Sequence, residues 1–343
     1  KEQGYDVIGV TMQIWQDEEN TVQEENGGCC GLSAVDDARR VAAAIGIPYY
    51  VMNFKKEFKC HVMDYFVAEY LRGHTPNPCI ACNRYVKWES LLQRSLEIGA
   101  DYIATGHYAR IDGVPNGRFA LRNSVTAAKD QTYALYNLTQ EQLAHTLMPV
   151  GEYTKDEIRV LAEEAGLPVA HKPDSQEICC VPDNDYASFI EQYTGQSSEP
   201  GDFVDKEGNV LGKHKGQIHY TIGQRRGLGI SAPESLYVCG KSLDSNKVIL
   251  GGKQDLMSTC CYINDINLIP WDHLDKPIKC KVKTRYRQPE QPATVEQLGD
   301  DLLKITFEEP QRAVTPGQAA VLYDGDMVLG GGTILPEGLA STK

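Results

Sequence analysis

Residues 33–54 read SAVDDARRVAAAIGIPYYVMNF, and this stretch decides the fold class. Its first four residues, Ser33-Ala-Val-Asp36, form a capping-box pattern that predicts a helix. The helix is expected to end at Ile45, because Gly46 and Pro48 stop it. The run at 49–54 is rich in aromatic and β-branched residues and predicts a strand. A helix followed directly by a short strand is typical of an α/β domain.

The flanking segments continue this alternation of strands and helices. Apolar residues at 7–10 predict a buried strand, and a helix is predicted over 58–71. A second helix is predicted over 83–98, followed by a strand at 102–105. The apolar residues of 83–98 recur at helical spacing, so we expect them in the core: Trp88, Leu91, Leu92 and Leu96. We predict a Rossmann-like domain over residues 1–144.

The remainder of the chain divides by its turn residues. Residues 145–199 are predicted to be a helical connector, in which Thr154-x-x-Glu157 is a capping box. It starts a helix with Ile158, Leu161 and Ala165 on one apolar face. From Pro200 onward, glycine-punctuated short strands replace helices, and Asp324-Gly325 marks a hairpin between two apolar runs. We predict antiparallel β structure from Pro200 onward, with a central β domain over 200–258 and a C-terminal β-barrel domain over 259–343.

Length and composition indicate a globular protein of two or three domains, with 343 residues and ordinary apolar content. No secretory signal or membrane-spanning apolar run is present, which favours a cytoplasmic protein without a membrane partner. In a reducing compartment, the eleven cysteines favour catalysis or metal binding over a disulfide framework.

The charge distribution leaves RNA binding open. A formal charge of −13 argues against a nucleic-acid binder, because Lys and Arg make the phosphate contacts. Acidic residues crowd 17–25, however, while short basic clusters stand at 213–215, 225–226 and 285–287. Local basic patches can bind RNA on an acidic protein.

The segment Gly73-His-Thr-Pro-Asn-Pro-Cys79-Ile-Ala-Cys82-Asn83 holds the densest chemistry. Its two prolines stiffen the approach to a helix, and the helix N-terminus increases the reactive thiolate fraction of a nearby cysteine. A lone C-x-x-C can also be half of a zinc site, but no second closely spaced Cys/His pair completes four ligands. We favour reactive thiols.

A second reactive cysteine is predicted in Asp174-Ser-Gln-Glu-Ile-Cys179-Cys180, which is a polar, turn-like stretch. The other cysteines lack such a context, and we expect most of them to be small core residues: Cys29, Cys30, Cys60, Cys239, Cys260, Cys261 and Cys280.

Two further segments are predicted to be binding loops. Ala104-Thr-Gly106-His107-Tyr-Ala-Arg110 directly follows a strand, where Gly106 would let a phosphate or base approach the backbone. Lys129-Asp-Gln-Thr-Tyr133 is the other. His107 alone is as consistent with a structural histidine as with a ligand-binding one.

Together these segments resemble the bacterial tRNA-uridine 2-sulfurtransferases of the MnmA type. The likeness runs in order along nearly the whole chain, through 9–15, Cys29-Cys30, 75–83, 104–109, 129–133, 174–179, 223–229, 284–287 and 316–318. It implies a Rossmann-like ATP-pyrophosphatase domain of the adenine nucleotide alpha hydrolase type, followed by a helical connector and small β-barrels.

The resemblance also implies residue roles. Cys179 would carry sulfur as a persulfide, and Cys82 would be its catalytic partner. Met12 and Gly106 would touch ATP, which is used with Mg²⁺. Asn77, Pro78 and Cys79 would line the target base. The residues implied to contact tRNA are His107, Lys129, Asp130, Gln131, Arg285, Tyr286 and Gln318.

The implied reaction thiolates the wobble uridine, position 34, in the anticodon stem-loop of tRNA. ATP adenylates the uridine O2, persulfide sulfur attacks C2, and AMP leaves. Cys82 then attacks the Cys179 persulfide and leaves a disulfide that a reductant reopens. The implied protein partner is a sulfur donor, such as a cysteine desulfurase or a sulfur relay protein.

Two departures from the family pattern have consequences. The family's nucleotide loop is expected to precede Lys1. We therefore expect the chain from Lys1 onward to bind ATP weakly, and ATP titration with and without that segment would check this.

The second departure is at Cys79, which stands where the family commonly has Asp. The thiols of Cys79, Cys82 and Cys179 could then ligate a [4Fe-4S] cluster with one iron open to sulfide, as an alternative to the persulfide.

Two other functions remain open from sequence. One is another ATP-pyrophosphatase, such as an amide-forming synthetase, which would not need both Cys82 and Cys179. The other is a non-catalytic RNA-binding protein, which would leave 2-thiouridine in cells unchanged when it is deleted.

Overall fold

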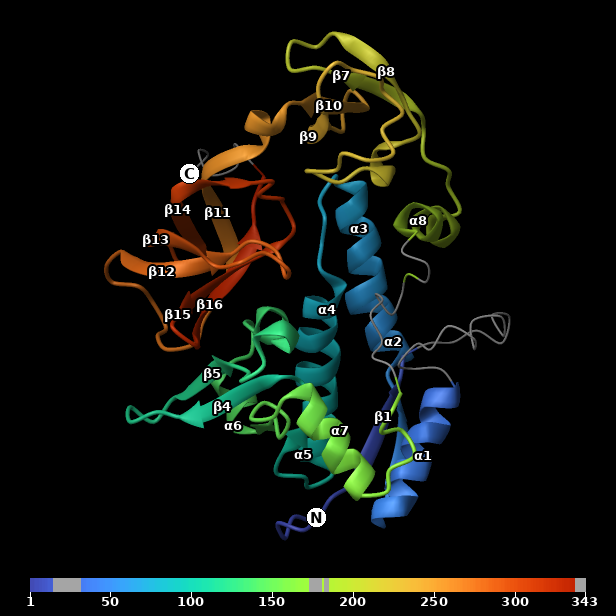
Figure 1. The fold of residues 1–343 in the computed structure, drawn as a ribbon, viewed down its shortest axis with the longest axis vertical. Helices are drawn as coiled ribbons and strands as arrows, with labels where there is room; N and C mark the ends of the chain where they lie inside the picture. Colours follow the sequence, from blue (N-terminus) through green and yellow to red (C-terminus); the bar gives the residue numbers. More distant parts are fainter. Residues whose placement is uncertain (15–31, 173–180, 182–184, 337–343) are drawn as a thin grey trace.

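The computed structural model describes residues 1–14, 32–172, 181 and 185–336. Figure 1 shows an N-terminal α/β part at one end of an elongated molecule, a small sheet at the other end, and a β-barrel beside the helices between them. The described part of the chain has no helix long and apolar enough to cross a membrane.

The N-terminal part is built on short parallel strand pairs. Strand β1 (Gly9–Gln13) pairs in parallel with β2 (Tyr49–Asn53), and β3 (Ile103–Ala104) pairs in parallel with β6 (Thr146–Leu147). Helix α1 (Leu32–Ile45) connects β1 to β2. These elements confirm the predicted α/β order.

Two long helical columns stand beside these strands. The first consists of α2 (Lys55–Phe58), the π-helical η2 (Lys59–Asp64) and α3 (Tyr65–Leu71). The second consists of α4 (Pro78–Ala81), the π-helical η3 (Cys82–Leu91) and α5 (Leu92–Glu97). The second column begins at Pro78 and not at Asn83 as predicted, because Asn77 supplies the N-cap and proline suits the first helical position.

The predicted core residues of the second column are confirmed. Trp88 and Leu92 are buried in one apolar cluster, and Leu96 packs against it. Leu91 packs against a second cluster that contains Phe58, Phe66 and other residues of the first column. The two columns therefore share apolar cores with the strands beneath them.

Strands β4 (Ala109–Gly113) and β5 (Phe119–Asn123) form a hairpin that leaves the α/β part. Strand β5 pairs with β16, so the hairpin extends the C-terminal sheet (Figure 1). The Asp326 carboxylate binds both Arg110 and Arg122 at 2.7 Å and fixes this junction. The sequence did not predict this pairing.

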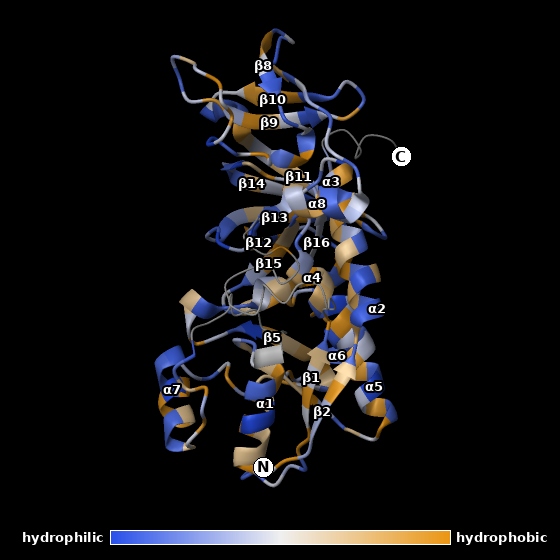
Figure 2. Ribbon diagram, turned by 90° about the vertical axis from the view of Figure 1, so that its right-hand side faces the viewer, coloured by the Kyte–Doolittle hydropathy of each residue, from blue (hydrophilic) through white to orange (hydrophobic). Residues whose placement is uncertain are grey.

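The connector contains two helices, the capped α7 (Lys155–Glu164) and α8 (Tyr186–Thr194). A short helix, α6 (Gln140–Ala144), precedes them. Thr154 and Glu157 form the predicted capping box. The predicted apolar face of α7 is not a buried one, however, since Leu161 is 45% exposed. Figure 2 shows α7 at the edge of the molecule.

The central β part is a four-stranded sheet in the order β8-β7-β10-β9. Its strands are β7 (Gly201–Val204), β8 (Val210–His214), β9 (Tyr237–Ser242) and β10 (Lys247–Gly251). Strands β7 and β10 pair in parallel, so the sheet is not wholly antiparallel as predicted. Phe203 and Tyr220 lie in its small apolar core.

The C-terminal strands close into a six-stranded antiparallel barrel, because β11 pairs with both β14 and β16. They are β11 (Met257–Leu268), β12 (Ile278–Lys283), β13 (Gln291–Gly299), β14 (Leu302–Arg312), β15 (Ala319–Asp324) and β16 (Met327–Ile334). The predicted hairpin is β15–β16, with Gly325 at φ +59° in its turn. The predicted fold class is confirmed, and the domain boundaries stay a prediction.

Candidate active site

The site begins where the chain enters the second helical column. Asn77 is extended, and its side-chain oxygen accepts hydrogen bonds from the amides of Cys79 at 3.0 Å and Ile80 at 3.4 Å. These bonds satisfy two donors of the first turn. Cys79 is exposed, and Cys82 is half-buried one turn further along the same helix. The N-terminus of this helix therefore presents both thiols, as predicted.

The residue after Cys82 begins a buried polar network. Asn83 is 3% exposed and donates to the carbonyl of Ala134 at 2.9 Å. Its oxygen accepts from the Lys87 ammonium at 2.9 Å, and that ammonium lies 3.3 Å from Nε2 of His107. This network ties the cysteine helix to the segment that follows β3. Lys87 was not predicted to belong to the site. Its position one turn after Asn83 is the only feature of the sequence that indicates this contact.

His107 is part of this network and is buried. Its Nδ1 lies 2.8 Å from the hydroxyl of Thr105, and its ring packs against Trp88 with centroids 5.4 Å apart. Burial, together with the charge of Lys87, holds the pKa of His107 well below its usual value. The neutral ring then accepts from Lys87 and donates to Thr105. A direct contact between His107 and tRNA stays a prediction.

The loop at 129–131 packs under the same region. Asp130 accepts hydrogen bonds from the amides of Ser124 at 2.8 Å and Thr132 at 3.1 Å. Gln131 accepts from the Tyr108 amide at 2.9 Å. These two side chains hold the shape of the loop, and Lys129 beside them is half-buried.

Tyr286 connects the barrel to this loop. Its hydroxyl donates to the Asp130 carbonyl at 3.0 Å, and its ring meets Tyr133 edge-on with centroids 5.9 Å apart. Burial first, and then the proximity of Asp130 and Cys79, raise the pKa of Tyr286. Tyr286 therefore joins the barrel to the 129–131 loop, and Cys79 lies near enough to contribute to the shift.

Two other residues predicted to contact tRNA make bonds within the protein. Arg285 donates to the Ile222 carbonyl at 2.9 Å and to the Thr315 hydroxyl. Gln318 donates to the Thr75 carbonyl at 2.6 Å, in the segment that leads to the cysteine helix. In this structure both side chains hold neighbouring segments together.

The predicted ATP contacts lie on β1 and after β3. Met12 is half-buried and packs against the apolar cluster of the helical columns. Gly106 has open space around it, since an added Cβ would meet no atom within 4 Å. That space would accommodate a ligand, and the ATP contacts themselves stay predictions.

Comparison with known proteins identifies the family of this chain. The family described as "tRNA methyl transferase HUP domain" matches residues 1–183, the related PRC-barrel domain matches 187–252, and an aminomethyltransferase β-barrel domain matches 258–334. A tRNA-specific 2-thiouridylase MnmA of Lachnoclostridium phytofermentans is 63% identical over 335 residues, covering 98% of this chain and 94% of the relative. The chain belongs to the tRNA-specific 2-thiouridylase MnmA family.

Other MnmA relatives agree with this assignment. The protein of Clostridioides difficile is 54% identical, and that of Acetivibrio thermocellus is 56% identical. Each match covers 97% of this chain and more than nine-tenths of the relative. The resemblance inferred from the motifs is thereby confirmed.

The second cysteine of the MnmA-type pair, Cys179, lies outside the described residues, as do Cys29 and Cys30. Among the residues that the structure describes, no group of three His, Cys, Asp or Glu side chains could hold a metal ion. A cluster held by Cys79, Cys82 and Cys179 therefore stays a prediction.

The remaining described cysteines are mostly shielded. Burial raises the pKa of Cys280 to about 12 and also raises the pKa of Cys261 and Cys239. Cys260 is half-buried. Cys60 is exposed and is therefore an exception to the expectation that most of these cysteines are core residues.

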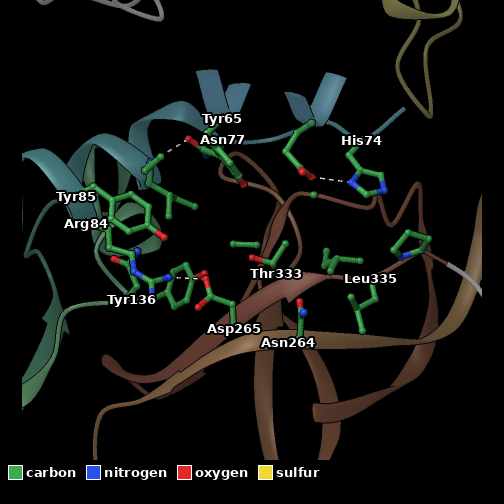
Figure 3. Close-up of a pocket in the computed structure, with 18 residues that line it drawn as sticks. Tyr65, His74, Asn77, Arg84, Tyr85, Tyr136, Asn264, Asp265, Thr333 and Leu335 are labelled. Atoms are coloured by element: carbon green, nitrogen blue, oxygen red, sulfur yellow. Dashed lines mark hydrogen bonds and ion pairs between the residues drawn. The ribbon is translucent and has the colours of Figure 1, made fainter. Parts of the chain in front are cut away.

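A cavity of about 270 Å³ lies between the helical columns and the barrel (Figure 3). Asn77, Ile80 and Arg84 line it from the helix, and Arg84 forms an ion pair with Asp265 of β11 across it. Nδ1 of His74 lies 2.7 Å from the Glu69 carboxylate. The sequence analysis missed this cavity because its walls come from segments far apart in the chain.

Proposed function

We propose that this chain is an ATP-dependent enzyme that replaces the O2 oxygen of the wobble uridine of tRNA with sulfur. The observation that carries the proposal is the Asn77-capped helix with Cys79 and Cys82 in its first two turns, near which Tyr286 of the barrel is bonded to the Asp130 carbonyl. The kinship with MnmA proteins along 98% of the chain supports the same reaction.

The first chemical step requires ATP, because the oxygen of a carbonyl is a poor leaving group. We propose that the uridine O2 attacks the α-phosphorus of ATP with Mg²⁺ and releases pyrophosphate. The open space at Gly106, after a parallel strand, supports a nucleotide near that position. Met12 is proposed to contact the same nucleotide.

The second step forms the carbon–sulfur bond. The outer sulfur of a Cys179 persulfide attacks C2, and AMP leaves with the uridine oxygen. The Cys82 thiolate then attacks the inner sulfur, which breaks the S–S bond and leaves thiouridine and a Cys82–Cys179 disulfide. An external thiol reductant returns both cysteines to thiols.

The bound tRNA would contact residues on both sides of the helix N-terminus. Asn77, Pro78 and Cys79 are proposed to line the base, and Lys129 and Tyr286 are the proposed contacts with the anticodon stem-loop. Tyr286 is 42% exposed, which supports this role. The inward bonds of Asp130, Gln131, Arg285 and Gln318 support a part in shaping that surface.

Cys79 makes a second sulfur source chemically reasonable. The thiols of Cys79, Cys82 and Cys179 are proposed as ligands of a [4Fe-4S] cluster, which would supply an open iron for sulfide. Cys79 and Cys82 lie one turn apart near a helix end, which supports ligation by both. Iron analysis after anaerobic reconstitution tests it. Iron that is lost in Cys79→Ala favours the cluster, whereas thiolation without bound iron rejects it.

The test of the function is thiolation of an anticodon stem-loop by the full chain with ATP, Mg²⁺ and a persulfide-forming sulfur source. We expect 2-thiouridine by mass spectrometry, and none from Cys82→Ala or Cys179→Ala. Cys60→Ser is the matched control, because Cys60 is exposed outside the site. Retained thiolation in either alanine variant would refute the cysteine pair.

The proposal also includes a cytoplasmic location. A cysteine desulfurase or a sulfur relay protein is the proposed sulfur donor.

A further inference from the structure

A turn of the barrel forms hydrogen bonds with the segment that leads to the cysteine helix. This turn, Thr315–Gln318, connects β14 to β15 and is called the barrel turn below. The Thr75 amide donates to the Pro316 carbonyl at 2.9 Å. The Gln318 side chain donates to the Thr75 carbonyl at 2.6 Å. Both main-chain polar groups of Thr75 are therefore bound by the barrel turn.

The contact is close enough to require glycine at one position. Gly317 has φ +85°, and a Cβ built on it would lie 2.9 Å from the Cβ of His74 and 3.1 Å from the Thr75 nitrogen. A side chain at position 317 would push the two segments apart. The approach of the barrel turn to residues 74–75 is thus a tightly packed contact.

The barrel turn is itself rigidly held. The Gly317 amide donates to the Ile334 carbonyl at 2.9 Å, and the Ile334 amide donates to the Gln318 carbonyl at 2.8 Å. Arg285 donates to the Thr315 hydroxyl, and that hydroxyl donates to the Ala313 carbonyl. The barrel turn therefore acts as a fixed point and not as a mobile loop.

Only two residues separate this fixed point from the start of the helix. Pro76 and Pro78 restrict the backbone on both sides of Asn77. Asn77 then bonds to the amides of Cys79 and Ile80. A shift of Thr75 is transmitted through this stiff segment to the cap and to Cys79.

The cavity behind the helix makes the polar contact more important. Asn77, His74 and Gly317 all line that cavity of about 270 Å³, so the segment is only partly packed on that side. Figure 3 shows His74 and Asn77 at the edge of this space. The hydrogen bonds to Thr75 add support at the edge of this space.

We infer that Gly317 and Gln318 are positioning residues for the sulfur-transfer site, acting through Thr75 on the helix that carries Cys79 and Cys82. The barrel then sets the geometry of the thiols as well as contributing to the tRNA-binding surface. This inference rests on the proposed function for its catalytic meaning, but the position of the thiols can be measured without turnover.

The first measurement is alkylation of each cysteine by iodoacetamide without tRNA or ATP, followed by mass spectrometry. Gln318→Ala and Gly317→Ala are expected to change the alkylation rate of Cys79 relative to Cys60 by roughly tenfold, because small displacements alter reactivity strongly. Gly325→Ala is the matched control. Gly325 also has positive φ (+59°) in the barrel, but its added Cβ would meet nothing within 4 Å.

The second measurement separates positioning from RNA contact. We expect Gln318→Ala to lower kcat for stem-loop thiolation roughly tenfold and to leave the stem-loop Kd within about twofold. An unchanged Cys79 alkylation rate together with a weaker Kd would overturn the inference and make Gln318 an RNA contact only. If no variant, nor the parent chain, thiolates tRNA, the proposed function fails while the alkylation result still decides the positioning role.

Discussion

Replacement of His107 by glutamine is expected to change how the stability of the protein depends on pH. The buried ring accepts a hydrogen bond from Lys87, and burial and that charge hold its pKa well below the ordinary 6.5. In the unfolded chain the same histidine binds a proton below about pH 6.5. Protonation therefore favours the unfolded state, and the stabilisation present above pH 6.5 is lost as pH falls below it.

The size of this effect follows from proton linkage. Each pH unit below 6.5 lowers the free energy of unfolding by up to about 1.4 kcal/mol while the folded ring stays neutral. Between pH 7.0 and 5.5 the loss from His107 amounts to about 1.3 kcal/mol. Burial also lowers the pKa of His214, but that contribution is shared by parent and variant and cancels in their difference.

The assay is urea unfolding followed by tryptophan fluorescence at several values between pH 5.5 and 7.0. His107→Gln lowers the absolute stability through lost packing, so the informative quantity is its shallower pH dependence. His171→Gln is the matched control, because the side chain of His171 is 81% exposed. Equal pH slopes for the parent and His107→Gln would refute a buried, neutral His107.

Three further outcomes are expected. Asn83→Ala removes the hydrogen-bond partner of the buried Ala134 carbonyl and one partner of the Lys87 ammonium. It should lower the free energy of unfolding by about 2–4 kcal/mol in urea titrations. Gly330→Ala puts a Cβ 2.0 Å from the Asn267 carbonyl oxygen at φ +129°, and should cost about 3 kcal/mol or more by the same assay. Gly106→Ala meets open space, so its unfolding curve should match that of Gly113→Ala, while its Michaelis constant for ATP rises if Gly106 adjoins the nucleotide. An unaltered constant would remove Gly106 from the ATP site.

Local patterns in the sequence predicted local structure well. The capping box at Thr154 and Glu157 starts α7 as expected, because its hydrogen bonds involve neighbouring residues. The helix at Pro78 was predicted to start five residues late, although Asn77 followed by proline is itself a helix-start signal. The predicted apolar face of α7 remains exposed, since periodicity states which residues share a face but not whether another element covers it.

The residues of the candidate site could be named from the sequence, but their contacts could not. The motifs identified Cys79, Cys82 and Gln318, and the helix end that presents the thiols follows from local signals. The bond from Gln318 to Thr75 spans 243 positions, and no local pattern contains such information. For the same reason the sequence could not distinguish a side chain that faces RNA from one that faces another segment.

The pairing of β5 with β16 also limits the order in which a ribosome can complete this protein. Leu121 is made long before Val328, its partner across the sheet, and Arg122 and Asp326 are 204 positions apart. The outer edge of the β4–β5 hairpin therefore stays unpaired until the last barrel strand has been synthesised. Nascent chains that stall before residue 327 should consequently need protection from association with one another.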